Sequence, residues 1–434
     1  MTQPTTRQSY ANPFLWVPSS YLAMGLIYVT VSGVANIMFK NLGMDNAKAA
    51  FWSSLFILPY TLKPLWAPVI ELYKTKKFFV LLMQFILVGL VVGIALSLRL
   101  PEGSYLGPLL VLLALTGILG ATQDIASDGV YVTTLTPAEQ AKYLGVQSMC
   151  WNAGPILANG VLVRVSGMLH KESGSWNQAW MVVLLIIAGL MAALALFHVK
   201  LLPTGSKAPD APKSVSEGLQ SFAHAFTTFF QKKDILLMIL FAFFFRFGYG
   251  FLEKMAPLFM IEAREKGGLG LSNEALGDIN GLFGTSAFMA ASILGGLFVA
   301  KRGLRRTLLT LCLCMNVPNV VFVYFSYAQP TSYALIATCL TIEKFAWGFG
   351  AVGLIIYMMQ QVSPGPYRTA HYTFGSALMG LNMMLTGMIS GKVQELLGYQ
   401  AFFIGVLAAA VPSILVTLYA PFHHPDSTEA GSAK

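Results

Sequence analysis

The most informative property of this sequence is how little charge it carries. Only 11% of its 434 residues are Asp, Glu, Lys or Arg, whereas 56% are hydrophobic. A soluble globular protein has about 25% charged residues, so a chain this poor in charge could not cover a soluble surface. The composition therefore excludes a soluble globular protein and predicts a polytopic, all-α membrane protein.

Residues that bind metals or form disulfides are also scarce. The four cysteines all lie in apolar segments without CxxC or metal-ligand spacing, and His371 has no second ligand nearby in the sequence. No phosphate-binding loop or nucleophile–base set is present. We therefore expect no metal, no cofactor, no ATP-driven transport and no enzyme activity.

Apolar runs long enough to cross a bilayer dominate the chain. A helix needs about 20 apolar residues to span the hydrocarbon core, and this rule predicts about twelve spans. The first run is too long for a signal-peptide core of about 7–15 residues, so we expect it to remain as the first span. The approximate limits are 14–39, 48–71, 78–99, 107–134, 141–168, 178–200, 234–262, 274–300, 306–328, 331–361, 369–396 and 398–421.

One polar interruption divides the spans into two sets of six. Residues 201–233 contain the stretch PTGSKAPDAPKS, which predicts a linker between an N-terminal half, residues 1–200, and a C-terminal half, residues 234–434. A basic turn follows the second span in each half, Lys74–Lys77 in the first and Lys301–Arg306 in the second. The matching positions predict two pseudo-symmetric halves of a duplicated transporter.

The net charge of +9 is concentrated in these turns and in the linker. No basic face with interleaved aromatic side chains is present, so we expect no nucleic-acid partner. Lys and Arg are enriched in the cytoplasmic loops of membrane proteins. A cytoplasmic N-terminus places both basic turns and the linker inside, so we expect both termini to be cytoplasmic. We also expect a monomer in the lipid bilayer.

Two aspartates interrupt the fourth span within GATQDIASDGVYV, residues 120–132. Asp124 and Asp128 are four residues apart and therefore share one helix face. A charge at the bilayer centre costs at least about 2.5–3.5 kcal/mol, so each needs a partner or a cavity. Lys63, at a similar depth in the second span, could neutralise Asp124, and Asp128 could reach the basic turn around Lys74. These residues predict either a structural ion-pair cluster or a gate on the cytoplasmic side.

A second group of charges lies near the predicted midplane of the C-terminal half. Arg246 is in the seventh span, and Glu343 and Lys344 are in the tenth, at the depth where two-repeat transporters bind substrate. Glu343 beside Arg246 predicts either a proton-coupling carboxylate or a fixed ion pair, with Asp124 as a second coupling candidate. Arg246 and Lys344 could instead hold an anionic group of the substrate.

Further polar and aromatic residues complete the predicted site. Glu253 and Lys254 could form an outer gate, and Arg164 is expected to extend its charge toward the outer head groups. Aromatic side chains could stack on sugar rings, with helix packing as the alternative. The residues expected to contact a small-molecule substrate are Gln123, Asn152, Arg246, Lys254, Lys344, Trp151 and Tyr28.

Several stretches in both halves form a recognisable set: Leu62–Pro68, Ala121–Gly129, Phe245–Gly248, Gly267–Ser272, Arg302–Arg306, Ile342–Glu343 and Thr369–Tyr372. Together they resemble one branch of the major facilitator superfamily, the AmpG-like muropeptide permeases. The chain looks similar to a shorter, 12-span version of these permeases that is common in Bacteroidetes-type bacteria. The resemblance implies the superfamily fold, the inner membrane of a Gram-negative bacterium, and proton-driven import of anhydro-muropeptides for peptidoglycan recycling.

One position departs from the resemblance. Many relatives carry an Arg in a GYRLG-like stretch of the fifth span, whereas Asn152 stands there in this chain. An anionic substrate group would then need another cation. Siderophore permeases share the QDIxxDG motif, so a siderophore permease of the same fold is one alternative function. A non-transporting membrane sensor or scaffold is the other. The prediction is proton-coupled import of muropeptides or related anhydro-amino-sugar fragments.

Overall fold

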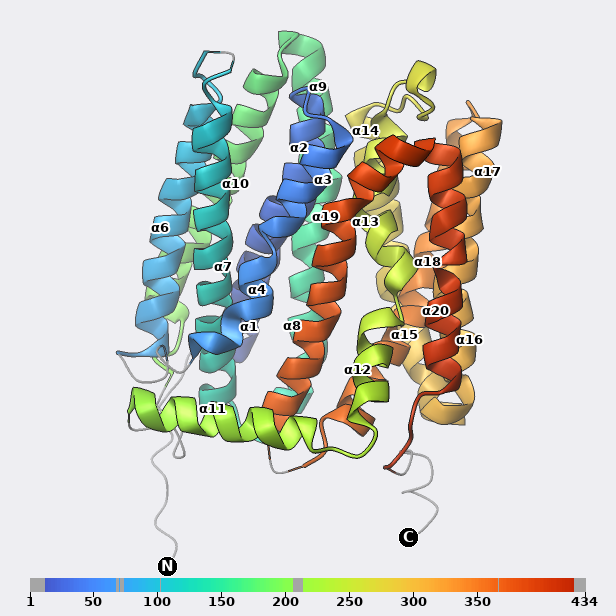
Figure 1. Cartoon of the computed structure of the whole chain (residues 1–434). Coiled ribbons are helices and arrows are strands. Elements are labelled where there is room, and N and C mark those ends of the chain that lie inside the picture. Colours follow the sequence, from blue (N-terminus) through green and yellow to red (C-terminus); the bar gives the residue numbers. More distant parts are fainter. Residues whose placement is uncertain are drawn as a thin grey trace, which may run out of the picture.

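The computed structural model describes residues 12–424 except 68–69, 71–73, 102, 206–213 and 366, and these residues form helices, turns and loops without a strand. Most helices run side by side along one direction, whereas α11 (Val215–Phe230) lies across one end of the bundle (Figure 1). We refer to this end as the α11 end. The first helix begins there and the last helix ends there (Figure 1).

Six spans precede α11. Short π-helical or 3-10 segments interrupt three of them and change the direction of the side chains that follow. In chain order the elements are α1 (Pro13–Val29), η1 (Thr30–Val34) and α2 (Ala35–Asn41); α3 (Asn46–Leu55), α4 (Leu58–Leu62) and η2 (Lys63–Leu65); α6 (Lys76–Ser97); α7 (Leu106–Thr134); α8 (Pro137–Pro155), η3 (Ile156–Leu162) and α9 (Val163–Ser173); and α10 (Trp176–Leu201).

Six spans follow α11 and repeat this plan. They are α12 (Ile235–Phe244) with α13 (Phe247–Ile261) and the short η4 (Arg264–Lys266); α14 (Asn273–Leu276), η5 (Gly277–Gly284) and α15 (Thr285–Arg302); α16 (Leu304–Asn316), η6 (Val317–Asn319) and α17 (Val320–Ala328); α18 (Tyr333–Tyr357) with η7 (Met358–Val362); and α19 (Arg368–Ala408) with α20 (Ala410–Leu418).

The number of membrane crossings confirms the prediction of about twelve. Within the described residues, nine stretches are long and apolar enough to cross a membrane, and one of them, Ala370–Leu418, is broken at Gly398 into two. The more polar second and fifth spans supply the remaining two. Observed limits differ from the predicted ones by a few residues, as for Leu304–Ala328 against 306–328. The end of the predicted second span, beyond Ile70, lies outside the described residues.

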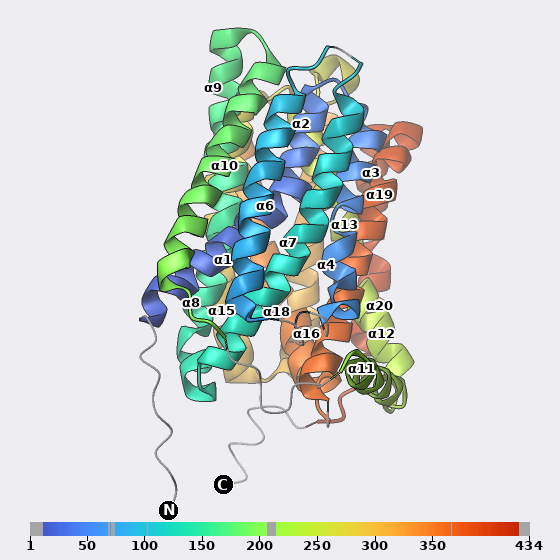
Figure 2. The same ribbon diagram turned by 90° about the vertical axis from the view of Figure 1, so that its left-hand side faces the viewer.

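The predicted linker, residues 201–233, contains the helix α11, which its polar composition does not predict. Most of PTGSKAPDAPKS lies outside the described residues, but α11 begins immediately after it. Ser214 accepts a hydrogen bond from the backbone N–H of Glu217 and caps the helix. Figure 2 shows α11 end-on at the edge of the bundle, beside α12.

Candidate functional site

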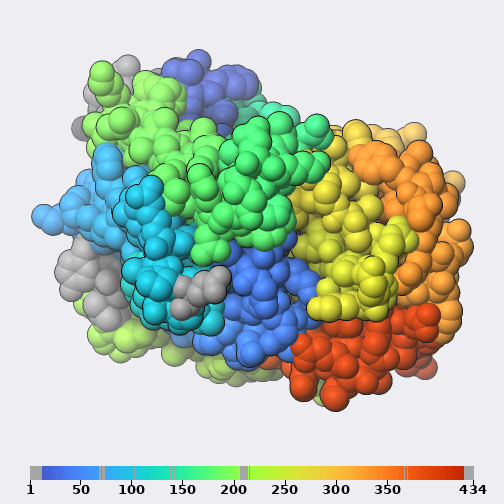
Figure 3. Space-filling model, turned by 90° about the horizontal axis from the view of Figure 1, so that it is seen from above, coloured from blue at the N-terminus to red at the C-terminus, as the bar shows by residue number. Residues whose placement is uncertain are grey.

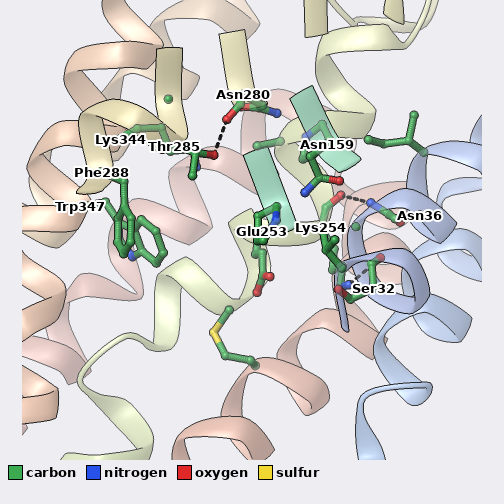
Figure 4. A pocket seen from close by; sticks show the side chains of 18 of the residues that line it. Ser32, Asn36, Asn159, Glu253, Lys254, Asn280, Thr285, Phe288, Lys344 and Trp347 are labelled. Carbon is green, nitrogen blue, oxygen red and sulfur yellow. Dashed lines mark hydrogen bonds between the residues drawn. The ribbon is translucent and has the colours of Figure 1, made fainter. Parts of the chain in front are cut away.

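A cavity of about 350 Å³ lies between the two halves and is lined by the middle parts of six spans. Three π-helical segments contribute polar side chains or carbonyls to it, through Ser32 of η1, Asn159 of η3 and Asn280 of η5. A π-helical turn leaves backbone groups imperfectly paired and often occurs at functional sites. The sequence therefore places irregular backbone where the two halves enclose a polar space (Figure 4).

The cavity carries more positive than negative charge. Its charged lining residues are Arg246, Lys254, Lys344 and one acid, Glu253. Amide side chains add both donors and acceptors, and they come from both halves: Asn36, Asn152, Asn159 and Asn280. Cations with converging amides suit a polar solute that carries anionic groups.

Arg246 occupies a break in the seventh span. The helix ends at Phe244 and restarts at Phe247, and Arg246 adopts φ −119° and ψ 32° between the two parts. Its Nη2 donates to the carbonyl of Met379 at 3.2 Å, and its buried Nε has no partner. A discontinuous helix with a cation at its restart is a favourable place for an anionic substrate group.

Lys254 links the two halves. Its Nζ donates to the carbonyls of Ser32 at 3.2 Å and Ser53 at 3.4 Å, and Asn36 donates to the carbonyl of Lys254 (Figure 4). No ion pair joins the described side chains of Glu253 and Lys254. The lysine extends across the interface to the first and second spans, and an outer gate formed by Glu253 and Lys254 stays a prediction.

Three aromatic rings form a column on the C-terminal wall. Trp347 lies between Phe288 and Tyr249, with centroid distances of 4.4 Å and 4.3 Å (Figure 4). Lys344 Nζ lies 3.3 Å from the Tyr249 hydroxyl. Because both faces of Trp347 are covered, it cannot stack on a sugar ring. Trp151, which lines the opposite wall with Tyr28, remains the better candidate for ring contact.

Glu343 lies behind this wall and does not line the cavity. Its side chain is only 1% exposed, and its nearest charge is Lys344, whose Nζ lies 3.5 Å from a carboxylate oxygen. Neither oxygen has a hydrogen-bond donor. The predicted pairing with Arg246 is wrong, because Arg246 turns toward Met379 of α19. Glu343 is therefore a buried carboxyl group whose one ion-pair partner in the described part of the chain is its sequence neighbour.

A separate polar cluster lies inside the N-terminal half. Lys63 and Asp124 form the predicted ion pair. The Tyr21 hydroxyl donates to Asp128 at 2.7 Å. Lys74 itself is exposed, so any contact between Asp128 and the basic turn around it falls to another residue of that turn.

The basic turn around Lys74 contacts the fourth span next to Asp128 through Lys76. Lys76 is buried, and its aliphatic carbons pack beside Gly129 of α7. Its position at the start of a capped helix, after Thr75, was the available signal. Lys63 is paired with Asp124, whereas Asp128 accepts the hydrogen bond from Tyr21. Two carboxylates one helical turn apart form a site where a proton could reside.

Replacing Asp124 by asparagine is expected to lower the melting temperature of the purified protein, because Lys63 loses its counter-ion. Lys63 is 28% exposed, so the cost should stay below the roughly 3–5 kcal/mol of a fully buried pair. The double variant Lys63→Met/Asp124→Leu should recover the melting temperature but transport slowly, as expected of a gate. A double variant that transports at the normal rate would show that the pair only joins two helices.

Two other predicted contact residues have different outcomes. Gln123 is buried within the N-terminal half and does not line the cavity, so its prediction as a substrate contact is wrong. Gln123 is one position before Asp124 on α7, so its side chain points about 100° away from that of Asp124 around the helix. Asn152 does line the cavity, and its amide donates to the carbonyl of Ser148 one turn earlier at 2.9 Å. Its carbonyl oxygen remains an acceptor for a ligand.

The two halves are held together at the end opposite α11. Hydrogen bonds join described residues of the two halves there, from Asn46 to Gln394 at 2.8 Å and from Asn273 to Ser166 at 2.9 Å. Three ion pairs have the same polarity, with the cation in the N-terminal half and the acid in the C-terminal half: Lys40–Glu262, Arg164–Asp278 and Lys171–Glu274. The expectation that Arg164 reaches the head groups is wrong, because Asp278 of η5 lies opposite it.

Close backbone contact also closes this end. The segments η3 and η5 cross at Gly160 and Gly281, and a Cβ atom on Gly281 would lie 1.9 Å from the Cα of Gly160. Only two glycines permit so close an approach. Seen from this end, the blue and green N-terminal half meets the yellow and red C-terminal half along a continuous seam (Figure 3).

Comparisons with known proteins agree with this architecture. The family model described as Major Facilitator Superfamily matches residues 19–391. A Rickettsia felis protein named as a transporter, AmpG 4, is 24% identical over 415 residues, which cover 92% of this chain and 94% of its own. The anhydromuropeptide permease of Escherichia coli is 23% identical over 399 residues, covering 91% of this chain and 77% of its own.

Solved structures show the same fold. The D-xylose-proton symporter superposes with a TM-score of 0.72 at 13% identity, covering 95% of this chain and 97% of its own. The nucleoside transporter NupG superposes with a TM-score of 0.66 at 17% identity, covering 94% of this chain and 98% of its own. The order of twelve spans in two halves is therefore shared with transporters of known structure.

Proposed function

Because the chain belongs to the Major Facilitator Superfamily, we propose that it imports muropeptides or related anhydro-amino-sugar fragments across a bacterial inner membrane, driven by protons. The observation that carries this proposal is the cavity between the halves, with its excess of cations and its converging amides. Muropeptides combine carboxylates, acetamido groups and hydroxyls. Arg and Lys bind carboxylates, and Asn side chains both donate to and accept from amides and hydroxyls.

The relatives favour this substrate class over others with the same fold. AmpG 4 and the anhydromuropeptide permease align with more than nine-tenths of this chain. Arg246 replaces, in our proposal, the cation that Asn152 does not provide. Its position at the helix break makes it the contact for a carboxylate, and Lys344 lies on the same C-terminal side of the cavity.

The basic turns and α11 set the proposed orientation. The exposed Lys74, Lys301 and Arg302 lie at or next to the start of α6 and the end of α15. Both of these helix ends lie at the α11 end (Figure 1), and cytoplasmic loops carry an excess of Lys and Arg. The α11 end is then cytoplasmic, and the three inter-half ion pairs close the periplasmic side. In this orientation the conformation is the one that releases substrate to the cytoplasm.

Proton coupling is assigned first to Glu343 and second to the Asp124–Asp128 cluster. A coupling carboxyl must gain and lose a proton as its surroundings change. Glu343 fits because, among the described residues, Lys344 is the one cation paired with it and no hydrogen-bond donor contacts its oxygens. Movement of Lys344 toward a bound substrate would then favour the protonated carboxyl.

Uptake of two labelled compounds tests the substrate assignment. Cells that express this protein and lack their own permeases are given radiolabelled anhydro-muropeptide or a ferric siderophore, in separate assays. We expect saturable uptake of the muropeptide and none of the siderophore. Uptake of the siderophore alone would assign the chain to the siderophore permeases. If neither compound is taken up, the chain imports neither substrate class.

Replacing Arg246 by glutamine should raise the half-saturation concentration for the muropeptide by roughly 30-fold or more. Removing one partner of a desolvated charge pair costs about 2–5 kcal/mol, and each 1.4 kcal/mol is tenfold. Arg302→Gln, at an exposed position of the basic turn, serves as the matched control and should leave this concentration unchanged. Equal effects of the two substitutions would remove Arg246 from the substrate site.

A further inference from the structure

The linker helix α11 has an apolar strip that the described residues leave uncovered. Leu219, Phe226 and Phe230 are 52%, 47% and 48% exposed. With Ala223, also exposed, they recur at intervals of three and four residues, which places them along one side of a helix. On another side, Gln220 and Thr227 are exposed polar residues. The helix is therefore amphipathic over a surface that faces away from the protein.

The rest of the helix is attached to the C-terminal half. Phe222, Phe226 and Phe229 surround the ring of Phe374 at centroid distances of 5.5–5.8 Å. His224 is hydrogen-bonded to the Tyr367 hydroxyl at 2.8 Å. Similar polar contacts join Thr228 to His371 and Lys232 to the carbonyl of Pro364. These contacts hold α11 against the beginning of α19 and fix the direction of its exposed strip.

The position of α11 indicates what covers the strip. The helix lies across the spans at the edge of the bundle, beside α12 (Figures 1 and 2). Phe230 is five residues before the span that begins at Ile235, whose Leu236 is 66% exposed to the surroundings of the bundle. The strip thus continues the lipid-facing surface of α12 at the level where the hydrocarbon ends. Lys233, exposed between them, suits an anionic head group.

We propose that α11 is an interfacial helix that inserts Leu219, Ala223, Phe226 and Phe230 into the leaflet at its end of the bundle. Helices of this kind lie in the interface plane with their apolar side about 5–10 Å deep. The contacts with α19 then anchor the C-terminal half to the membrane surface. The proposal concerns lipid contact alone, so its test does not depend on which substrate the protein transports.

Spin labels at single cysteines test this proposal in the full-length protein. The four native cysteines are replaced by alanine, and the protein is reconstituted into vesicles of phosphatidylethanolamine and phosphatidylglycerol. Labels at positions 219, 226 and 230 should be relaxed by oxygen and protected from a water-soluble nickel chelate. Labels at positions 220 and 227 should show the opposite pattern, and a label at position 236 provides the lipid-facing reference.

Each other outcome would overturn the proposal. Relaxation by nickel at positions 219, 226 and 230 would place the strip in water. Protection from both reagents would mean that a second copy or another part of the protein covers it. A second measurement keeps the native cysteines: Phe226→Trp should add emission that lipids brominated on the acyl chains quench, and unquenched added emission would equally contradict insertion.

Discussion

Replacing Gly281 by alanine is expected to reduce transport strongly while the protein still folds. The added Cβ would overlap the backbone of Gly160, so η3 and η5 could no longer cross as closely as they do. Overpacking of this kind costs about 1–3 kcal/mol, which corresponds to roughly a 5- to 150-fold shift away from the closed arrangement. The fifth and eighth spans must approach each other at the end opposite α11 before substrate can be released at the α11 end. The uptake rate should therefore fall by a similar factor.

The matched control for this substitution lies in the same span. A Cβ on Gly296 would meet nothing within 4 Å, so Gly296→Ala should transport normally. Closure is measured by cross-linking cysteines at positions 171 and 274, whose native side chains form an ion pair at 2.7 Å. The yield should fall in the Gly281 variant and stay high in the control. An undiminished yield with normal uptake would show that this crossing does not control closure.

Replacing Glu343 by glutamine is expected to abolish accumulation against a gradient. Glutamine has nearly the same shape but cannot carry a proton, so substrate movement would no longer be coupled to proton movement. Downhill exchange of labelled for unlabelled substrate should continue, and its rate should not change with pH. The measurement compares the internal-to-external substrate ratio with the exchange rate in the same vesicles.

Two variants separate coupling from a loss of structure. Glu265 is exposed outside the cavity, and Glu265→Gln should accumulate substrate normally. Glu343→Asp retains a carboxyl beside Lys344 and should retain part of the accumulation. If Glu343→Gln still concentrates its substrate, the coupling group lies elsewhere, and the Asp124–Asp128 cluster becomes the assignment to test in the same way.

The spans and the Lys63–Asp124 pair could be predicted because both depend on local or strongly constrained physics. Apolar runs near 20 residues have few alternatives to a membrane-spanning helix, and two opposite charges at one depth in lipid favour each other. Of the seven predicted contact residues, six line the cavity. Their shared feature is polarity or aromaticity near the middle of a span.

The remaining details depend on rotations that a sequence does not reveal. Neighbouring residues on a helix differ by about 100°, so Glu343 points behind the wall while Lys344 lines the cavity. The π-helical segments add further rotation, which brings Asp278 opposite Arg164. Charge gave only a partial signal for the inter-half pairs, because the outer loops of both halves hold residues of both signs.

Transport by the purified protein in vesicles is the most direct test of the central claim. The vesicles carry an imposed pH gradient, alkaline inside, and receive radiolabelled anhydro-muropeptide. The proposal predicts that the internal concentration rises above the external one and returns to equality when a protonophore is added. Uptake that reaches only equality, with or without the protonophore, would contradict proton-coupled import.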